Sequence, residues 1–213
     1  GFGTDKRDPN DINDGYLEGN YAEWYEPPGV ADKVATLAKT PDLPWGPGEV
    51  VRYRDQDMFL LGVAMAEYLK RKEGRDADLW AMLVNEVYRP IGIHHAPTNR
   101  TIESDGSKGQ AIMAFGYYPS LSDIAKIAAL YQNKGRHRDD QILYAPLIGT
   151  MLAGPQDRGL PTGGKDAYGE GRYHMSFWNA RYDASDSCKL YLPAMIGWGG
   201  NIVALMPNGM TGI

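Results

Sequence analysis

Three runs near the C-terminus have the alternating character of strands with one buried face. They are YHMSFWNAR, KLYLPAMIG and NIVALMP, all after Gly171, and short turn-forming stretches separate them. Short turns join antiparallel strands, whereas parallel strands need long crossover connections. The end of the chain therefore predicts an antiparallel sheet.

Helical periodicity marks the part of the chain that precedes these runs. Residues 30–39, VADKVATLAK, form a short amphipathic pattern. Apolar residues within the range 56–72 fall on one helical face, and Gly74 follows as a stop signal. A further helix is expected from a cap at Asp76 to about Tyr88, before Pro90.

Two more helices are expected after residue 118. In SLSDIAKIAALYQNKG, Ser120 and Asp123 make a variant of the capping box, and Gly135 ends the segment. Residues 145–153 form one more short helical pattern. Because helices come first and strands last, the fold class is α+β with segregated layers.

Two segments have no clear period and are expected to be loops, residues 1–30 and 91–118. The first is rich in Gly, Asp, Asn and Pro but also carries aromatic residues, which favours an ordered loop over disorder. We expect a single incomplete domain, with a lid loop and helical region over residues 1–165 and antiparallel strands over 166–213. The aromatic residues that either form an apolar lid or pack within the loop are Phe2, Tyr16, Tyr21, Trp24 and Tyr25.

Composition excludes several classes of function. The chain has 213 residues and a formal net charge of −5, with no basic run, which argues against nucleic-acid binding. No stretch approaches the roughly 18 consecutive apolar residues of a membrane helix, and no signal peptide is visible. The chain begins with Gly and stops within a pattern, so we expect a piece of a longer protein. Its one cysteine, Cys188, is expected to be a buried or half-buried structural thiol.

Motifs for metals and nucleotides are incomplete. GLPTGGKD resembles a phosphate-binding loop, but Asp166 stands where Ser or Thr would hold magnesium. DPNDINDG lacks the spacing of a calcium loop. His94 and His95 are adjacent and point in different directions on any regular element, so they are poorly placed to share a metal. We therefore expect no cofactor and no metal.

Two features remain as candidates for chemistry. Tyr53 lies on the turn before the helix at residues 56–72, where a positive helix end would lower its pKa and suit it to act as a base. A packing tyrosine is the alternative. The other feature is GWGGN at residues 197–201, where glycines let a ligand approach and an exposed amide would polarise a carbonyl. A bulge or tight turn is its alternative.

Taken in order, these segments resemble the serine β-lactamase and penicillin-binding-protein-like hydrolase family. The resemblance is closest to its class C-like branch, which includes family VIII carboxylesterases and 6-aminohexanoate-dimer hydrolase. It spans about residues 40–207. The segments that carry it are PGEVVRYRDQDMFLLG, VYRPIGIHHA, AFGYYPSLSDIAKIAALYQNKG, YHMSFW and GWGGNIVALMP.

The resemblance implies an α+β, β-lactamase-like fold and hydrolysis of an ester or amide through an acyl-enzyme. It implies that Tyr53 is the general base or acid. Trp198, Gly199 and Gly200 would be the third motif in its W-G-G form, and the backbone N–H of Asn201 would be one oxyanion donor.

Two departures from the family pattern matter. Asp55 stands at the family's Asn position, where a carboxylate would raise the pKa of the catalytic lysine and repel anionic substrates such as β-lactams. No serine in the chain has Lys three residues later, so the S-x-x-K nucleophile is absent. Thr36 and Lys39 have that spacing but lie too close before Tyr53. We therefore expect this chain to be inactive alone, with a missing segment of the same protein as its partner.

Two other readings stay open. One is a catalytically dead homologue with a binding or scaffolding role, which Asp55 and the absent nucleophile favour. The other is an unrelated α+β binding domain, in which helices would pack away from the sheet. The compartment is open too, although family members are often exported or periplasmic.

Overall fold

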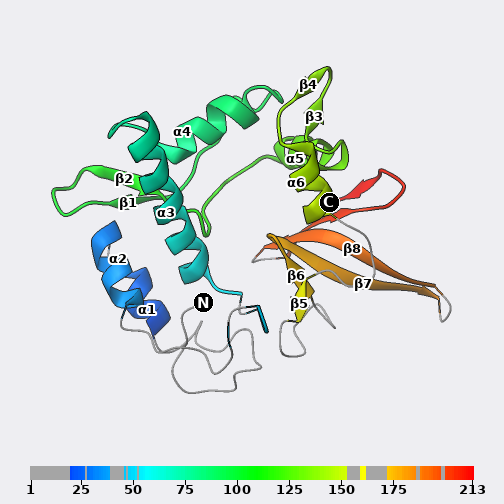
Figure 1. Cartoon of the computed structure of the whole chain (residues 1–213), viewed down its shortest axis with the longest axis horizontal. Helices are drawn as coiled ribbons and strands as arrows, with labels where there is room; N and C mark the ends of the chain where they lie inside the picture. Colours follow the sequence, from blue (N-terminus) through cyan, green and yellow to red (C-terminus); the bar gives the residue numbers. More distant parts are fainter. Residues whose placement is uncertain are drawn as a thin grey trace. The chain divides into compact units, whose positions relative to one another are not determined.

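The computed structural model describes most of the chain. The described residues are 20–26, 28–38, 46, 48–51, 53–152, 159–161, 172–185, 188–197 and 200–213. Among them, no helix combines the length and the apolar character needed to cross a membrane. Helices and antiparallel strands both occur, as the sequence predicted (Figure 1).

The chain forms two compact units whose segments alternate along the sequence. We call the first the helical unit; it comprises residues 1–47, 52–85 and 95–118. We call the second the sheet unit; it comprises residues 48–51, 86–94 and 119–213. The sequence predicted a different kind of division, between a lid loop with helices over residues 1–165 and strands over residues 166–213. That division stays a prediction.

The helical unit consists of helices and one hairpin (Figure 1). Its helix α3 matches the predicted pattern closely, with Gly74 as the C-cap at φ +108°. α2 also confirms its predicted pattern. The elements are α1 (Asn20–Tyr25), α2 (Val30–Leu37), α3 (Asp55–Glu73), α4 (Leu79–Leu83), β1 (Arg100–Ile102) and β2 (Lys108–Ala111).

Trp24 lies at the centre of the helical unit's core. It is fully buried and packs in one cluster with the buried residues Leu37, Phe59 and Ile112. Its ring meets the ring of Phe59 edge to face at a centroid distance of 5.6 Å. Of the two readings for the aromatic residues near the N-terminus, packing therefore holds for Trp24. The expectation of a loop throughout residues 1–30 is wrong at α1, while residues 1–19 lie outside the described part.

Two other expectations for this region are corrected. The helix after α3 begins at Asp78 rather than Asp76, because the Asp78 carboxylate accepts from the Ala81 N–H at 2.8 Å and the buried face starts at Leu79. It then continues as a π-helix, η1 (Val84–Tyr88). The presumed loop over residues 91–118 contains the β1–β2 hairpin, whose short polar strands lack an alternating pattern.

The sheet unit contains a six-stranded antiparallel sheet in the order β10-β9-β8-β7-β6-β5. Neighbours in sequence are neighbours in space, as short turns require. The three predicted strand runs are confirmed, but the first is divided between β6 and β7 by Met175 and Ser176, at φ +45° and +72°. The strands are β5 (Leu160–Pro161), β6 (Arg172–His174), β7 (Phe177–Ser185), β8 (Cys188–Gly197), β9 (Asn201–Leu205) and β10 (Thr211–Gly212).

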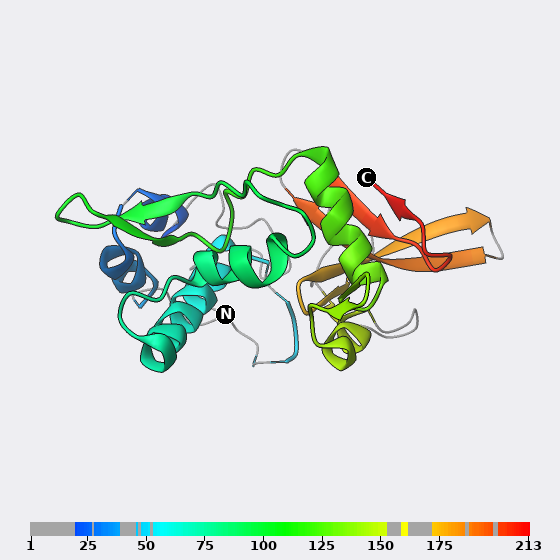
Figure 2. The ribbon, with the colours of Figure 1, turned by 90° about the horizontal axis from the view of Figure 1, so that it is seen from above.

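Helix α5 (Leu121–Gln132) covers one face of this sheet (Figure 2). The predicted capping box is present, since Ser120 accepts from the Asp123 N–H and Asp123 accepts from the Ser120 N–H. Ala128 of α5 is fully buried against Phe177 and Val203. The unrelated-domain reading required helices packed away from the sheet, so this packing counts against it.

The remaining elements of the sheet unit lie after α5. A small hairpin pairs β3 (Arg136–His137) with β4 (Asp140–Gln141), and α6 (Ala145–Met151) follows where a short helix was expected. Cys188 was expected to be buried or half-buried, but it is exposed. The reason is its position: it pairs with Ser185 at the end of the β7–β8 hairpin where the chain passes from one strand to the next.

Candidate functional site

Tyr53 lies immediately before the N-cap of α3. Arg54 is that N-cap, with an extended backbone at φ −149° and no side-chain capping bond. Asp55 is the first residue of the helix, and Asp57 lies in the same turn. Both carboxylates therefore lie in the first turn, at the positive end of the helix dipole. Tyr53 and Asp55 are both half-buried.

Two residues that the sequence patterns did not single out are the most deeply buried in this segment. Arg54 and Gln56 each keep only 1% of their surface exposed. In the described part of the chain, Oε1 of Gln56 accepts no hydrogen bond. Buried amides normally have partners, so an unused acceptor next to Asp55 is a feature that requires an explanation. Nothing in the sequence marks it, because Gln56 occupies an ordinary position in a helical pattern.

The glycine-rich turn connects β8 to β9. Gly197 pairs with Asn201, and Gly200 adopts φ +83°, a conformation that favours glycine. A Cβ added at Gly200 would meet no atom within 4 Å in the described part of the chain. Within this part, Gly200 is therefore required by its backbone conformation rather than by close packing, as the tight-turn reading states. Trp198 and Gly199 lie outside the described residues.

The candidate residues divide between the two units. Tyr53 and Asp55 belong to the helical unit, whereas Gly200 and Asn201 belong to the sheet unit. The adjacent His94 and His95 are both exposed. Across the residues that the structure describes, no group of three or more His, Cys, Asp or Glu side chains could hold a metal ion.

Comparison with known proteins gives matches among solved structures. No family model and no curated protein matches the chain. A solved structure described as "Putative 6-aminohexanoate-dimer hydrolase from Bacillus anthracis" is similar, with a TM-score of 0.63 and 15% sequence identity. The match covers 99% of this chain and 50% of that chain, so this chain spans about half the length of its structural neighbour.

This likeness concerns the fold. It extends over nearly the whole chain, so the helices and the antiparallel strands both take part in it. The neighbour carries the name of one branch of the family that the sequence motifs resemble. The comparison therefore shows that this chain shares its fold with about half of a solved structure of that name.

Proposed function

We propose that this chain is the central and C-terminal part of a serine hydrolase that cleaves an ester or amide through an acyl-enzyme. The observation that carries the proposal is the agreement between the ordered motifs and a fold match that covers 99% of this chain but 50% of its neighbour. The nucleophile is supplied by a missing segment of the same protein, and the chain alone is inactive.

In this proposal, the start of α3 provides the proton-transfer group. Tyr53 acts as general base or acid toward the serine hydroxyl and the leaving group. Its place before an uncapped helix N-terminus supports this role, because the helix dipole favours the phenolate. The unused acceptor of Gln56 and the carboxylate of Asp55 suit a neighbouring donor such as the lysine of an S-x-x-K segment.

The β8–β9 turn provides the acyl-binding side in this proposal. Trp198, Gly199 and Gly200 border the pocket, and the backbone N–H of Asn201 donates to the oxyanion. Among the described residues, no atom lies within 4 Å of a Cβ placed at Gly200, which supports access by a ligand. Asp55 disfavours anionic substrates by repulsion, so we propose neutral or cationic esters and amides over β-lactams.

The open edge of the sheet supports the proposal that another segment of the protein pairs with this chain. β10 pairs only with Ala204 and Leu205 of β9. Among the described residues, β10 does not extend along Ile202 and Val203 at the outer edge of β9, and Ile202 is 47% exposed. Open apolar edges associate. We expect the isolated chain to bind the missing segment, dimerise or aggregate; a monodisperse monomer in light scattering would contradict this.

Labelling of the full-length parent protein by a fluorophosphonate probe tests the proposal. We expect one labelled serine, followed three residues later by lysine, on tryptic peptides. Tyr53→Phe should slow labelling about 10²–10⁴-fold, the usual contribution of acid–base catalysis. Tyr68→Phe is the matched control, because Tyr68 lies on the same helix and is 64% exposed. Full labelling that is insensitive to Tyr53→Phe would remove Tyr53 from the mechanism.

The alternative is a catalytically dead homologue with a binding or scaffolding role. Asp55 favours it, because a carboxylate at this position makes the lysine a poorer neutral base. A folded full-length protein without any labelled serine would establish it. For the isolated chain, both readings expect no turnover of p-nitrophenyl acetate or of 6-aminohexanoate dimer. Turnover above background that Tyr53→Phe abolishes would refute the assignment of the nucleophile to another segment.

A further inference from the structure

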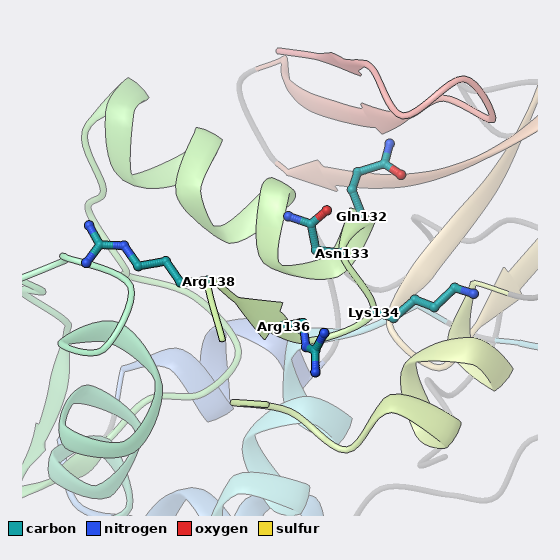
Figure 3. A pocket seen from close by; sticks show the side chains of 5 residues that line it. All are labelled: Gln132, Asn133, Lys134, Arg136 and Arg138. Carbon is teal, nitrogen blue, oxygen red and sulfur yellow. The ribbon is translucent and has the colours of Figure 1, made fainter. Parts of the chain in front are cut away.

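A pocket of about 430 Å³ lies where α5 ends and the β3–β4 hairpin begins. The residues that line it are Gln132, Asn133, Lys134, Arg136 and Arg138 (Figure 3). Three of these side chains are cationic and none is acidic, although the chain as a whole has a net charge of −5. The pocket therefore concentrates positive charge on an acidic protein.

The three cations have no side-chain partner among the residues that the structure describes. In the described ranges, the side chains of Lys134, Arg136 and Arg138 form no ion pair and donate no hydrogen bond. All three are exposed. Asp139 and Asp140 belong to the same hairpin but do not line the pocket. The positive charge of the pocket is thus available to a ligand.

Two of these cations occupy unfavourable backbone positions. Lys134 and Arg138 have φ values of +54° and +53°, where glycine or asparagine is preferred. The hairpin enforces this geometry at Gly135, where a Cβ would lie 2.6 Å from the carbonyl oxygen of Leu143. The Gly135 carbonyl also accepts from the Leu143 N–H at 3.0 Å. Strained residues of this kind cluster at functional sites.

We propose that this pocket binds a small multivalent anion that bears phosphate or carboxylate groups. Figure 3 shows Lys134 and Arg138 extending to opposite sides of Arg136, so a monovalent anion would engage one cation, whereas a multivalent anion is shared among them. All three side chains are exposed, and among the described residues no ion pair holds them in place. Guanidinium groups bind both anion types in a bidentate manner, and the volume suits a small molecule.

Backbone anchoring supports a fixed site. The Gln132 amide donates to the carbonyl oxygens of Met206 and Met210 at 3.2 and 2.8 Å, which ties the end of α5 to the β9–β10 turn. The Gln141 amide donates to the carbonyl of Lys134 at 2.9 Å. Hydrogen bonds therefore hold the backbone on which the exposed cationic side chains stand. It does not depend on the proposed hydrolase activity.

Calorimetric titration of the 213-residue chain with tripolyphosphate, and separately with citrate, tests this proposal. We expect saturable binding at one site, which weakens as salt is added. Arg138→Gly should weaken binding at least about fivefold, the loss of one charged contact, without lowering the melting temperature, because glycine relieves the strained φ. If tripolyphosphate binds more tightly, the site prefers phosphate groups. If citrate binds more tightly, the site prefers carboxylate groups.

Arg75→Gly is the matched control, since Arg75 is exposed in the turn after α3 and its loss changes the net charge equally. Equal weakening by both variants, or binding that never saturates, would overturn the proposal. A second readout needs no variant. Phenylglyoxal modification, mapped by mass spectrometry, should be slowed at Arg136 and Arg138 by tripolyphosphate but not at Arg75. Equal protection of all three would also overturn it.

Discussion

Gly62 is a buried glycine in the middle of α3, the helix that begins at the candidate Tyr53–Asp55 segment. A Cβ at this position would lie 2.7 Å from both Cβ and Cγ of Met113. Those atoms are close to the Met113 backbone, so rotation of the side-chain end does not relieve the contact. The substitution Gly62→Ala therefore forces α3 or the segment around Met113 to shift.

The expected magnitude follows from two opposing effects. Overpacking of a close contact costs about 1–3 kcal/mol. Replacing glycine by alanine within a helix gains about 1 kcal/mol, through helix propensity and a less flexible unfolded chain. The net effect of Gly62→Ala is a loss of about 0–2 kcal/mol in the free energy of unfolding. Gly149→Ala is the control, because Gly149 is an exposed residue of α6 whose Cβ would meet no atom of the described residues within 4 Å. It should gain about 0.5–1 kcal/mol.

Urea unfolding followed by circular dichroism measures both variants, each in the transition of the unit that contains it. Met113→Ala would remove the contact with Cγ but keep the one with Cβ, so Met113→Gly is the background in which both close contacts are gone. In that background Gly62→Ala should be stabilising. The two substitutions thus have a coupling energy of about 1–3 kcal/mol. If Gly62→Ala stabilises the wild-type chain as much as Gly149→Ala does, the packing of α3 against Met113 described above is wrong.

Two further predictions concern titratable groups. The Arg100 guanidinium donates to Asp78 at 3.0 Å and holds the pKa of that carboxyl below its usual range. The ionised carboxyl therefore stabilises the folded chain above about pH 4, and this stabilisation is lost as the pH falls through the lower pKa of the folded state. Asp78→Asn should cost about 1 kcal/mol at pH 7, because the pair is partly exposed, and much less in acid; equal urea midpoints for the two proteins at pH 7 would contradict this. Burial lowers the pKa of Lys33, so the unfolded chain binds more protons and stability rises with pH between the folded value and about 10.4. Lys33→Met should remove this alkaline rise in thermal melts, and an unchanged rise would show that another group causes it.

The sequence predicted the elements that carry local signals. α3 and α5 have an apolar face, and α5 also has a side-chain cap, so short-range pattern and tertiary structure agree there. The same holds for the β7–β9 meander, whose strands alternate and whose turns are short. Each of these elements is recognisable because its own residues determine where it begins and ends.

The elements that pattern reasoning missed depend on distant contacts. α1 has six residues, too few for a stable isolated helix. It is held by Lys33 of α2, whose Nζ donates to the carbonyl oxygens of Trp24 and Tyr25 at 2.8 Å each. The same ammonium lies 4.9 Å from the centroid of the Trp24 ring. A lysine in an amphipathic pattern normally faces water, so its role as a buried cap for another helix has no signature in the sequence.

The candidate site also combines features that local sequence determines with features that depend on distant parts of the protein. Pattern reasoning placed Tyr53 before a helix because a helix start is a local event, and α3 begins at Asp55. From the sequence, the glycines after β8 were consistent with a tight turn and with an oxyanion site. The φ of +83° at Gly200 agrees with the turn and does not exclude the oxyanion site. One residue can satisfy a turn and also leave space for a substrate, since both need the missing Cβ. An oxyanion site requires a nucleophile that attacks a carbonyl, whereas a turn does not. Labelling of a serine in the full-length protein therefore tests whether these glycines belong to an oxyanion site.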